Sequence, residues 1–191
     1  MAATDIEVAN NALVSIGAGS IASFSDGSTE SDIASTIYET YVKAELASGR
    51  YTFAKEQTSM NRLTAAPTEG WDYAYQLPSN LLTLTRVTFG DGDIRYERVG
   101  DKVFTNTKDE NDTVVAHYTF RVLEPNWPAH FEQAVVDGLM LRFAVALGLE
   151  KWILQSIATI ADTARKDARR EDSQNETAKR LRLTRFKNRR L

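Results

Sequence analysis

The spacing of apolar residues changes twice along this 191-residue chain, and these changes limit the folds that it can adopt. Apolar residues recur at helical spacing over about residues 5–16 and 29–48. Over about residues 71–122, β-branched and aromatic residues become frequent and alternate with polar ones. Helical spacing returns over about residues 128–148 and 150–172. We therefore predict an α+β protein, mainly an α-helical bundle, with an antiparallel β insertion between the second and third main helices.

Capping signals support the predicted helix starts. Thr4-x-x-Glu7 has the form of a capping box, in which two side chains satisfy free backbone N–H groups, and Thr29-x-x-Asp32 indicates a second helix start. Pro128 suits the first turn of the third helix, because its missing N–H would be unpaired there. These signals predict that the helices begin near residues 5, 29 and 128.

Turn signals divide the β insertion into strands. Residues 81–89 read as a strand, and the Gly-Asp-Gly-Asp run at 90–93 predicts a hairpin turn after it. Residues 94–99 and 102–105 form a second predicted pair around Gly-Asp. The clearest strand is 114–122, where an apolar and a largely polar face alternate.

Three other segments differ in how firmly their structure can be predicted. Tyr51 and Phe53 fit either the start of a strand or another helical turn. Apolar residues occur almost all round the helix from Phe131 to Leu149, which predicts the buried centre of the bundle. The last helix has a narrower stripe, typical of a surface helix, formed by Ile153, Ile157, Ile160, Ala164 and Ala168.

The composition excludes several kinds of protein. The chain has no cysteine, which excludes disulfides, a cysteine nucleophile and cysteine-based zinc sites. The N-terminus lacks the basic start and apolar run of a signal peptide. The most apolar stretch, residues 134–149, contains Asp137 and Arg142 and is too short to span a bilayer. We expect a soluble protein without a membrane partner that is not exported by a signal peptide.

Catalytic and metal-binding patterns are weak. His117 and His130 belong to no metal-spaced or nucleophilic pattern, and we expect ordinary surface roles for both. Several acidic residues lie close together but form no calcium-binding loop with a closing glutamate, so we interpret them as exposed turns. They are Asp91, Asp93, Asp109, Glu110 and Asp112. We predict no catalytic residue, no metal, no cofactor and no enzymatic activity.

The charges are divided unevenly between the body and the C-terminus. Residues 179–191 contain seven Lys or Arg and no acidic residue, whereas the rest of the chain has 16 basic and 26 acidic residues. Three interpretations are open for this tail: an arm that orders on a protein partner, a clamp on DNA phosphates, or a solvated terminus. The apolar residues interleaved among the charges favour a protein partner, because phosphate binding alone does not require them.

Several motifs carry a family resemblance through their order. They are Ala-Asn-Asn-Ala-Leu-Val-Ser-Ile-Gly at 9–17, Ile-x-Ser-Phe-x-Asp at 21–26, Gly-Arg-Tyr-Thr-Phe-Ala at 49–54, Gly-Trp-Asp-Tyr-Ala-Tyr-Gln-Leu-Pro at 70–78, and Pro-x-x-Phe-x-x-Ala at 128–134. Together they resemble the tail tubular A and head-to-tail adaptor (connector) proteins of tailed bacteriophages. The resemblance covers about residues 5–150. Tyr51 stands where the family often has tryptophan.

The resemblance implies a structural role in the virion, at the head–tail junction, after synthesis in the host bacterial cytoplasm. The adaptor domain, residues 1–172, would pack into a homo-oligomeric ring beneath the portal protein, commonly of about twelve copies in heterologous contact. The ring would hold a downstream tail protein, such as a nozzle, stopper or tail tube, and let duplex DNA pass without sequence-specific binding during ejection. The alternative function is DNA binding through the basic tail.

The resemblance also assigns portal docking to an extended basic arm, residues 173–191. Its docking residues would be Lys179, Arg180, Leu181, Arg182, Leu183, Arg185, Phe186, Lys187, Arg189, Arg190 and Leu191. Trp71, Tyr73 and Tyr75 have two interpretations: a subunit interface, since such residues dominate interface hot spots, or a seal between the helices and the β insertion. We favour the seal.

Overall fold

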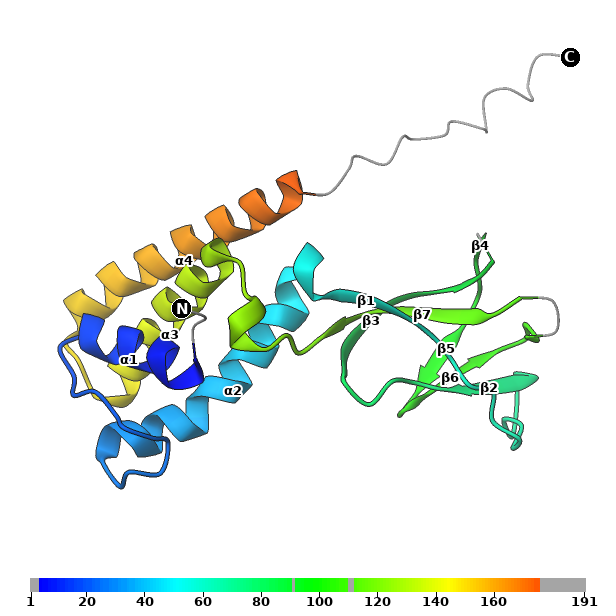
Figure 1. The fold of residues 1–191 in the computed structure, drawn as a ribbon, viewed down its shortest axis with the longest axis horizontal. Helices are drawn as coiled ribbons and strands as arrows, with labels where there is room; N and C mark the ends of the chain where they lie inside the picture. The colour runs from blue at the N-terminus through cyan, green and yellow to red at the C-terminus, as the bar shows by residue number, and fades with distance from the viewer. Residues whose placement is uncertain (1–3, 91, 110–111, 176–191) are drawn as a thin grey trace, which may run out of the picture.

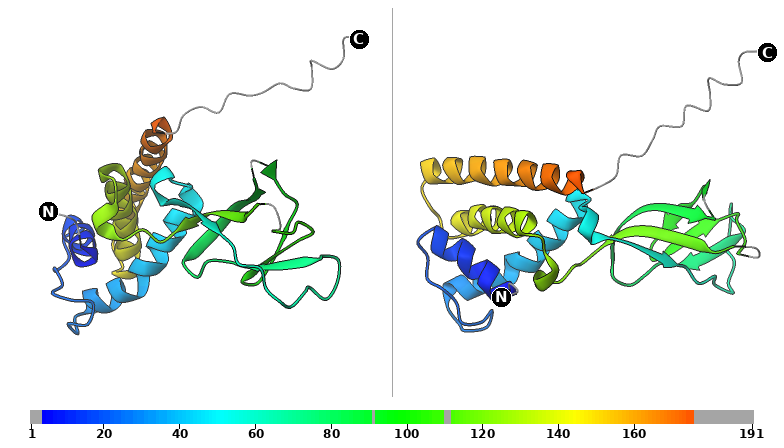
Figure 2. Two further views of the ribbon diagram at one scale, coloured as in Figure 1. Left: turned by 45° about the vertical axis from the view of Figure 1, so that its right-hand side comes forward. Right: turned by 45° about the horizontal axis from the view of Figure 1, so that its top comes forward.

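The computed structural model describes residues 4–90, 92–109 and 112–175 of the chain. Its helices form one part of the molecule and its strands a second part beside it (Figures 1 and 2). The fold class is α+β, as predicted from the sequence. Within the described residues the α-helices are α1 (Asp5–Ser15), α2 (Thr29–Gly49), α3 (Ala129–Ala146) and α4 (Lys151–Gln174).

The strands lie between α2 and α3 in the chain and form two antiparallel sheets among the described residues. They are β1 (Lys55–Ser59), β2 (Tyr73–Gln76), β3 (Leu81–Phe89), β4 (Gly92–Asp93), β5 (Glu97–Val99), β6 (Lys102–Thr105) and β7 (Val114–Phe120). One sheet has the order β1-β7-β3-β4 and the other β2-β6-β5. Residues of both sheets, among them Tyr75, Val103 and Tyr118, share one hydrophobic core.

The sequence located most of the β region but missed its first strand. The two alternatives for residues 51–53 both hold in part, because a single 3₁₀ turn (Thr52–Ala54) leads into β1. β1 consists of Lys-Glu-Gln-Thr-Ser and is an edge strand, so it has no apolar alternation to reveal it. The β region therefore begins at Lys55, not near residue 71, and the strand predicted over 94–99 is shorter, with β4 ending before it and β5 covering only Glu97–Val99.

The helix ends follow from local side-chain contacts. The capping box of Thr4 and Glu7 forms as predicted. α2 begins at Thr29, as predicted, and its N-cap is Ser28. Gly49 is the last residue of α2, and a β-carbon there would lie 2.0 Å from the ring of Tyr51. Glycine at this position therefore allows the fully buried Tyr51 ring to pack against the end of its own helix.

The predicted central helix, α3, contacts α1, α2 and α4 and fully buries Phe131, Leu139 and Phe143. The predicted surface stripe of α4 needs one correction, because Ile160 is half exposed and Ala161 is buried in its place. At about 100° per residue, a step of four residues from Ile157 stays nearer the packed face than a step of three.

Two contacts fix the helical part against the β part. Arg121, just after β7, forms an ion pair with Glu39 of α2 at 3.0 Å and another with Glu124. Asp172, in the last turn of α4, accepts hydrogen bonds of 2.7 Å from both the backbone N–H and the hydroxyl of Thr52. The C-terminal end of α4 is therefore attached to the turn that joins α2 to β1.

Buried tyrosines near α2 give the fold a pH dependence that can be measured. Burial raises the pKa of Tyr38, Tyr41 and Tyr51, and the carboxylates of Glu124 (beside Tyr38) and Glu45 (beside the other two) add to the shift. A raised phenol pKa means that the folded state favours the neutral form. This stabilisation is complete below the unfolded pKa of about 10 and is lost as the pH rises through the folded pKa.

We therefore expect an incomplete phenolate absorbance titration until alkaline unfolding, since these three of the seven tyrosines remain neutral, and burial raises the pKa of Tyr75 and Tyr118 as well. Circular dichroism at each pH identifies the unfolding step, and protein in denaturant, in which every tyrosine is solvated, serves as the control. Complete ionisation near pH 10 with an unchanged far-UV spectrum would contradict this expectation.

Candidate assembly interface

The residues predicted for portal docking, 179–191, lie outside the described residues. So does part of the predicted arm, which was drawn from residue 173. The structure instead describes residues 173 and 174 as the end of α4. The basic segment begins five residues after the last residue of a helix whose end is attached to Thr52 through Asp172.

The aromatic residues of the 70–78 motif lie in the β part. Tyr75 is fully buried between the sheets, and its hydroxyl donates to the carbonyl of Thr107 at 3.0 Å, so it offers no surface to a neighbouring chain. Trp71 and Tyr73 are partly exposed. Arginine side chains lie over both rings, at 5.5 Å for Trp71 and 5.8 Å for Tyr73.

These aromatics do not seal the join between helices and strands, which was the favoured interpretation. Tyr75 and Tyr73 pack in the core of the two sheets, and the indole N–H of Trp71 donates to the carboxylate of Glu97 on β5. The join contains a different aromatic cluster, in which Tyr51, Phe53 and Trp127 each contact the ring of Phe131 at 4.8–5.0 Å. Aromatic residues therefore do pack at the join, but they come from residues 51–53 and 127–131 and not from residues 70–78.

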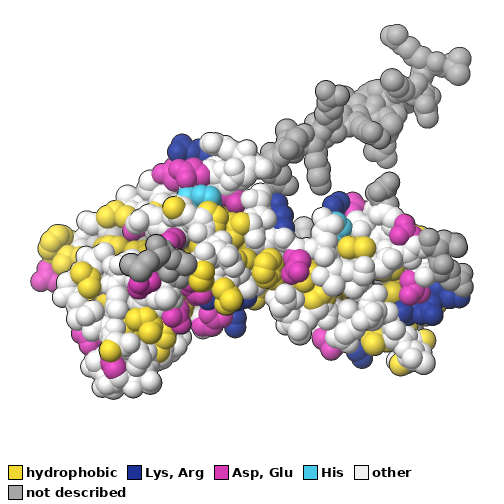
Figure 3. Space-filling model, viewed as in Figure 1, with side chains coloured by type: hydrophobic (Ala, Val, Ile, Leu, Met, Phe, Trp, Pro, Cys, Tyr) yellow, Lys and Arg dark blue, Asp and Glu magenta, His cyan; other side chains and the backbone are white. Residues whose placement is uncertain are grey.

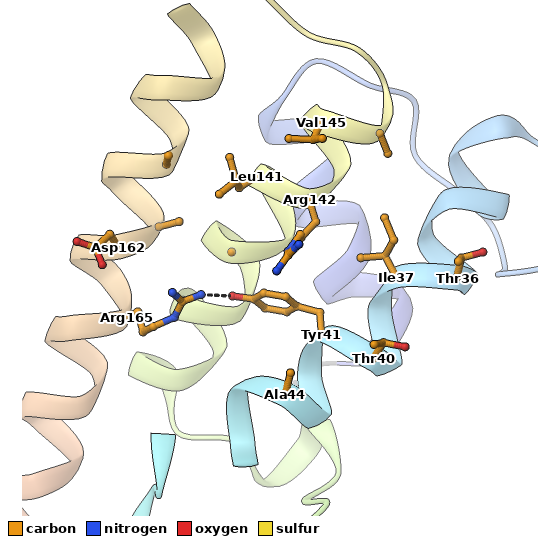
Figure 4. A pocket seen from close by; sticks show the side chains of 14 residues that line it. Thr36, Ile37, Thr40, Tyr41, Ala44, Leu141, Arg142, Val145, Asp162 and Arg165 are labelled. Carbon is orange, nitrogen blue, oxygen red and sulfur yellow. Dashed lines mark hydrogen bonds between the residues drawn. The ribbon is translucent and has the colours of Figure 1, made fainter. Parts of the chain in front are cut away.

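A groove lies between α2 and α4, with α3 as its floor. Figure 4 shows α4 on one side, α2 on the other and α1 behind α3. The groove has a volume of about 660 Å³. We call it the α2–α4 groove; its lining is mostly apolar and includes Ile37, Ala44, Leu141, Val145, Ala158 and Ala161.

The floor of the α2–α4 groove depends on Gly138 in the middle of α3. A β-carbon at Gly138 would lie 1.6 Å from the hydroxyl oxygen of Tyr41. Without it, Tyr41 extends from α2 across α3, and its hydroxyl accepts a hydrogen bond of 3.1 Å from Arg165 of α4 (Figure 4). Glycine weakens a helix interior by roughly 0.5–1 kcal/mol relative to alanine, so its presence here is explained by the close approach of Tyr41.

A buried carboxylate lies beyond the end of the groove that Ala44 and Arg165 line (Figure 4). Glu45 of α2 is almost completely buried and pairs with Arg165 at 2.9 Å and Arg169 at 3.5 Å, both on α4. The hydroxyl of Tyr51 donates to the same carboxylate at 3.1 Å. Since removing one partner of a buried pair leaves an uncompensated charge, this network holds α2 and α4 together at that end.

The opposite end of the α2–α4 groove combines apolar surface with an unneutralised charge. Val145, on the rim, is 59% exposed. Arg142 is exposed beside it, and among the described residues no carboxylate lies within ion-pair distance of its guanidinium. The carboxylate of Asp162, which also lines the groove, pairs with Lys166 at 2.6 Å. The rim is therefore suited to an apolar group that carries a negative charge.

A projecting tryptophan lies just beyond the end of α3. Trp152, in the first turn of α4, is 65% exposed, and its indole N–H donates to the carboxylate of Glu150. We call residues 150–153 the Trp152 corner. Trp152 does not line the α2–α4 groove, so the corner and the groove are separate surfaces of one chain. Sequence reasoning missed both, although an exposed tryptophan is a frequent signal of an interface.

The histidines and turn acids show no catalytic or metal geometry within the described ranges. His117 lies half-buried on β7, with its Nε2 3.0 Å from the hydroxyl of Thr88. The expected surface role of His130 is wrong, because its side chain is only 15% exposed between α3 and α4. Asp91 and Glu110 lie outside the described residues. No group of three or more metal-ligating side chains occurs in the part that the structure describes.

On the face that Figure 3 shows, the acidic side chains of the helical part are scattered and do not gather in one site. None of the described helices has the length and apolar character needed to cross a membrane.

Comparisons with protein-family models and with curated proteins gave no match for this chain.

The contact between Gly138 and Tyr41 predicts the effect of a small substitution. We expect Gly138→Ala to lower the free energy of unfolding by about 1–3 kcal/mol, the usual cost of overpacking, despite the better helix propensity of alanine. Chemical denaturation measures the change. On a Tyr41→Ala background the clash is absent, so the same substitution should be neutral or stabilising. An equal loss on both backgrounds would show that Tyr41 is not the cause.

Proposed function

We propose that this protein is a structural head–tail adaptor of a tailed bacteriophage, located in the virion at the junction of head and tail and made in the host cytoplasm. It forms a ring with copies of itself beneath the portal protein, and the ring binds a downstream tail component. It uses no cofactor and catalyses no reaction. Duplex DNA passes through the ring without sequence-specific binding.

The observation that carries this proposal is the attachment of α4 at its C-terminal end. Asp172 bonds to Thr52 at the junction of the helical and β parts, and α4 ends two residues later. A segment that follows such an end begins from a defined point on the body. The segment here carries seven positive charges with leucine and phenylalanine among them, which suits docking onto an acidic and apolar protein surface.

Two further features support a passive structural role. The chain outside residues 179–191 has an excess of acidic over basic residues, and a wall of like charge repels DNA, so a duplex slides past it. The helical and β parts also have separate hydrophobic cores, with Phe120 in contact with both. An elongated subunit of this kind can contact several neighbours at once.

The test is to quantify this protein by mass spectrometry in purified particles of its source virus, relative to the portal and capsid proteins. The proposal expects a copy number equal to that of the portal, or a simple multiple of it. Absence from mature particles would rule out the adaptor role. A much higher copy number would instead indicate a capsid or tail-tube component.

The alternative function is DNA binding through the basic segment, which the concentration of seven Lys or Arg in residues 179–191 favours. Each phosphate neutralised adds about 0.9 to the slope of log affinity against log salt. Duplex affinity that falls steeply with salt, and that disappears on truncation after Ala178, would support this alternative. Equal affinity with and without the segment would exclude it.

A further inference from the structure

We propose that the α2–α4 groove of one copy binds the Trp152 corner of a second copy, in a head-to-tail contact. This inference rests on the proposed function in one respect only, since repeated contacts of this kind form the ring. The contact itself is argued from the shape, polarity and charge of the two surfaces. The occupant of the groove would be the Trp152 corner of the second copy.

The two surfaces are complementary in shape. The groove is a hollow of about 660 Å³ between α2 and α4, and its lining includes Ile37, Val145 and Ala146. The corner projects, and its tryptophan is among the most exposed apolar side chains of the described structure. A tryptophan ring brings a large apolar area at a small cost in side-chain entropy, and such residues commonly anchor interfaces by filling a pocket.

The two surfaces are also complementary in charge. Glu150 is exposed at the corner, where its carboxylate holds the indole N–H of Trp152. Arg142 is exposed at the groove, without a carboxylate partner among the described residues. When the ring of Trp152 enters the groove, its attached carboxylate arrives beside the guanidinium. The hydrogen bond within the corner fixes the indole and the carboxylate relative to each other before binding, which lowers the entropy cost of association.

The proposed contact is heterologous: the corner of one copy enters the groove of a neighbour, and its own groove accepts the corner of a third copy. None of residues 150–153 lines the groove, so one copy can offer its corner to one neighbour while its groove accepts the corner of another. Such a contact repeats from copy to copy and closes into a ring when the rotation between neighbours allows it. The buried network of Glu45, Arg165 and Arg169 keeps the groove in shape, since it holds α2 and α4 together.

The experiment mixes two variants, each defective in one surface. Trp152→Ala removes the anchor but keeps the groove, whereas Ala158→Arg fills the groove and places a positive charge in it but keeps the corner. We expect each variant alone to self-associate at least about tenfold more weakly than the natural chain in sedimentation velocity, as expected for loss of a hot spot. Mixed together, the two should form one-to-one dimers that grow no further, because only one productive contact remains.

A matched control and a charge exchange keep the test decisive. Leu123→Ala removes an equally exposed apolar side chain outside both surfaces and should associate like the natural chain. Arg142→Glu and Glu150→Arg, both at exposed positions, should each weaken association, and the chain carrying both should recover it. Circular dichroism confirms that each variant is folded.

Two outcomes would overturn the proposal: unchanged association of Trp152→Ala, or mixed variants that remain monomeric. Its failure can be told apart from failure of the adaptor role. If the protein is present in particles at the portal copy number and the variants behave like the natural chain, the ring uses another surface. If the variants behave as expected and the protein is absent from particles, the self-contact stands without the adaptor role.

Discussion

Replacing Leu139 by aspartate is expected to unfold the chain. Leu139 is fully buried in α3, the helix that contacts α1, α2 and α4. Transfer of a carboxylate into this core without a partner costs several kcal/mol, which is a large part of the roughly 5–15 kcal/mol that stabilises a typical domain. The measurement is far-UV circular dichroism with thermal melting, where the variant should show no cooperative transition.

The control is the same substitution six residues further along the same helix. Val145→Asp places the new carboxylate on a side chain that is 59% exposed, so the fold and the melting transition should survive. The pair separates burial from helix propensity, because both substitutions place aspartate within α3. A folded Leu139→Asp chain with the melting temperature of the natural protein would mean that α3 is not the centre of the core.

The helices were predictable because they carry a strong periodic signal. In α3 the apolar residues occur almost all round the helix, and the structure places this helix at the centre of the bundle. The capping box at Thr4 forms because it depends only on neighbouring residues. β1 was not predictable, because an edge strand of polar residues is defined by its pairing with β7, a contact between segments more than fifty residues apart.

The candidate site was harder to predict for the same reason. The α2–α4 groove depends on the distance between α2 and α4, and no local sequence pattern indicates that distance. Gly138 was an available signal, since a glycine inside an otherwise apolar helix usually marks a close approach. Arg142, a charge in an apolar run, and Trp152, a large ring at the start of the last helix, were two more signals. The sequence alone did not show that Arg142 and Tyr41 line one groove.

The effect of removing residues 179–191 separates the two functions proposed for the basic segment. We expect the truncated protein to keep its melting temperature, since the bonds between Asp172 and Thr52 and both cores lie before the cut, and to lose binding to the portal protein in a pull-down. Binding is lost because the segment supplies both the positive charges and the apolar anchors of the proposed contact.

A second variant decides whether charge alone is responsible. Changing the four apolar residues of the segment to serine keeps all seven positive charges; these residues are Leu181, Leu183, Phe186 and Leu191. An arm that docks by its apolar side chains should lose portal binding in this variant too, whereas a purely electrostatic contact should keep it and weaken steeply with salt. Full portal binding by the truncated chain would assign the docking surface to the body, and the basic segment would then be free to act on DNA.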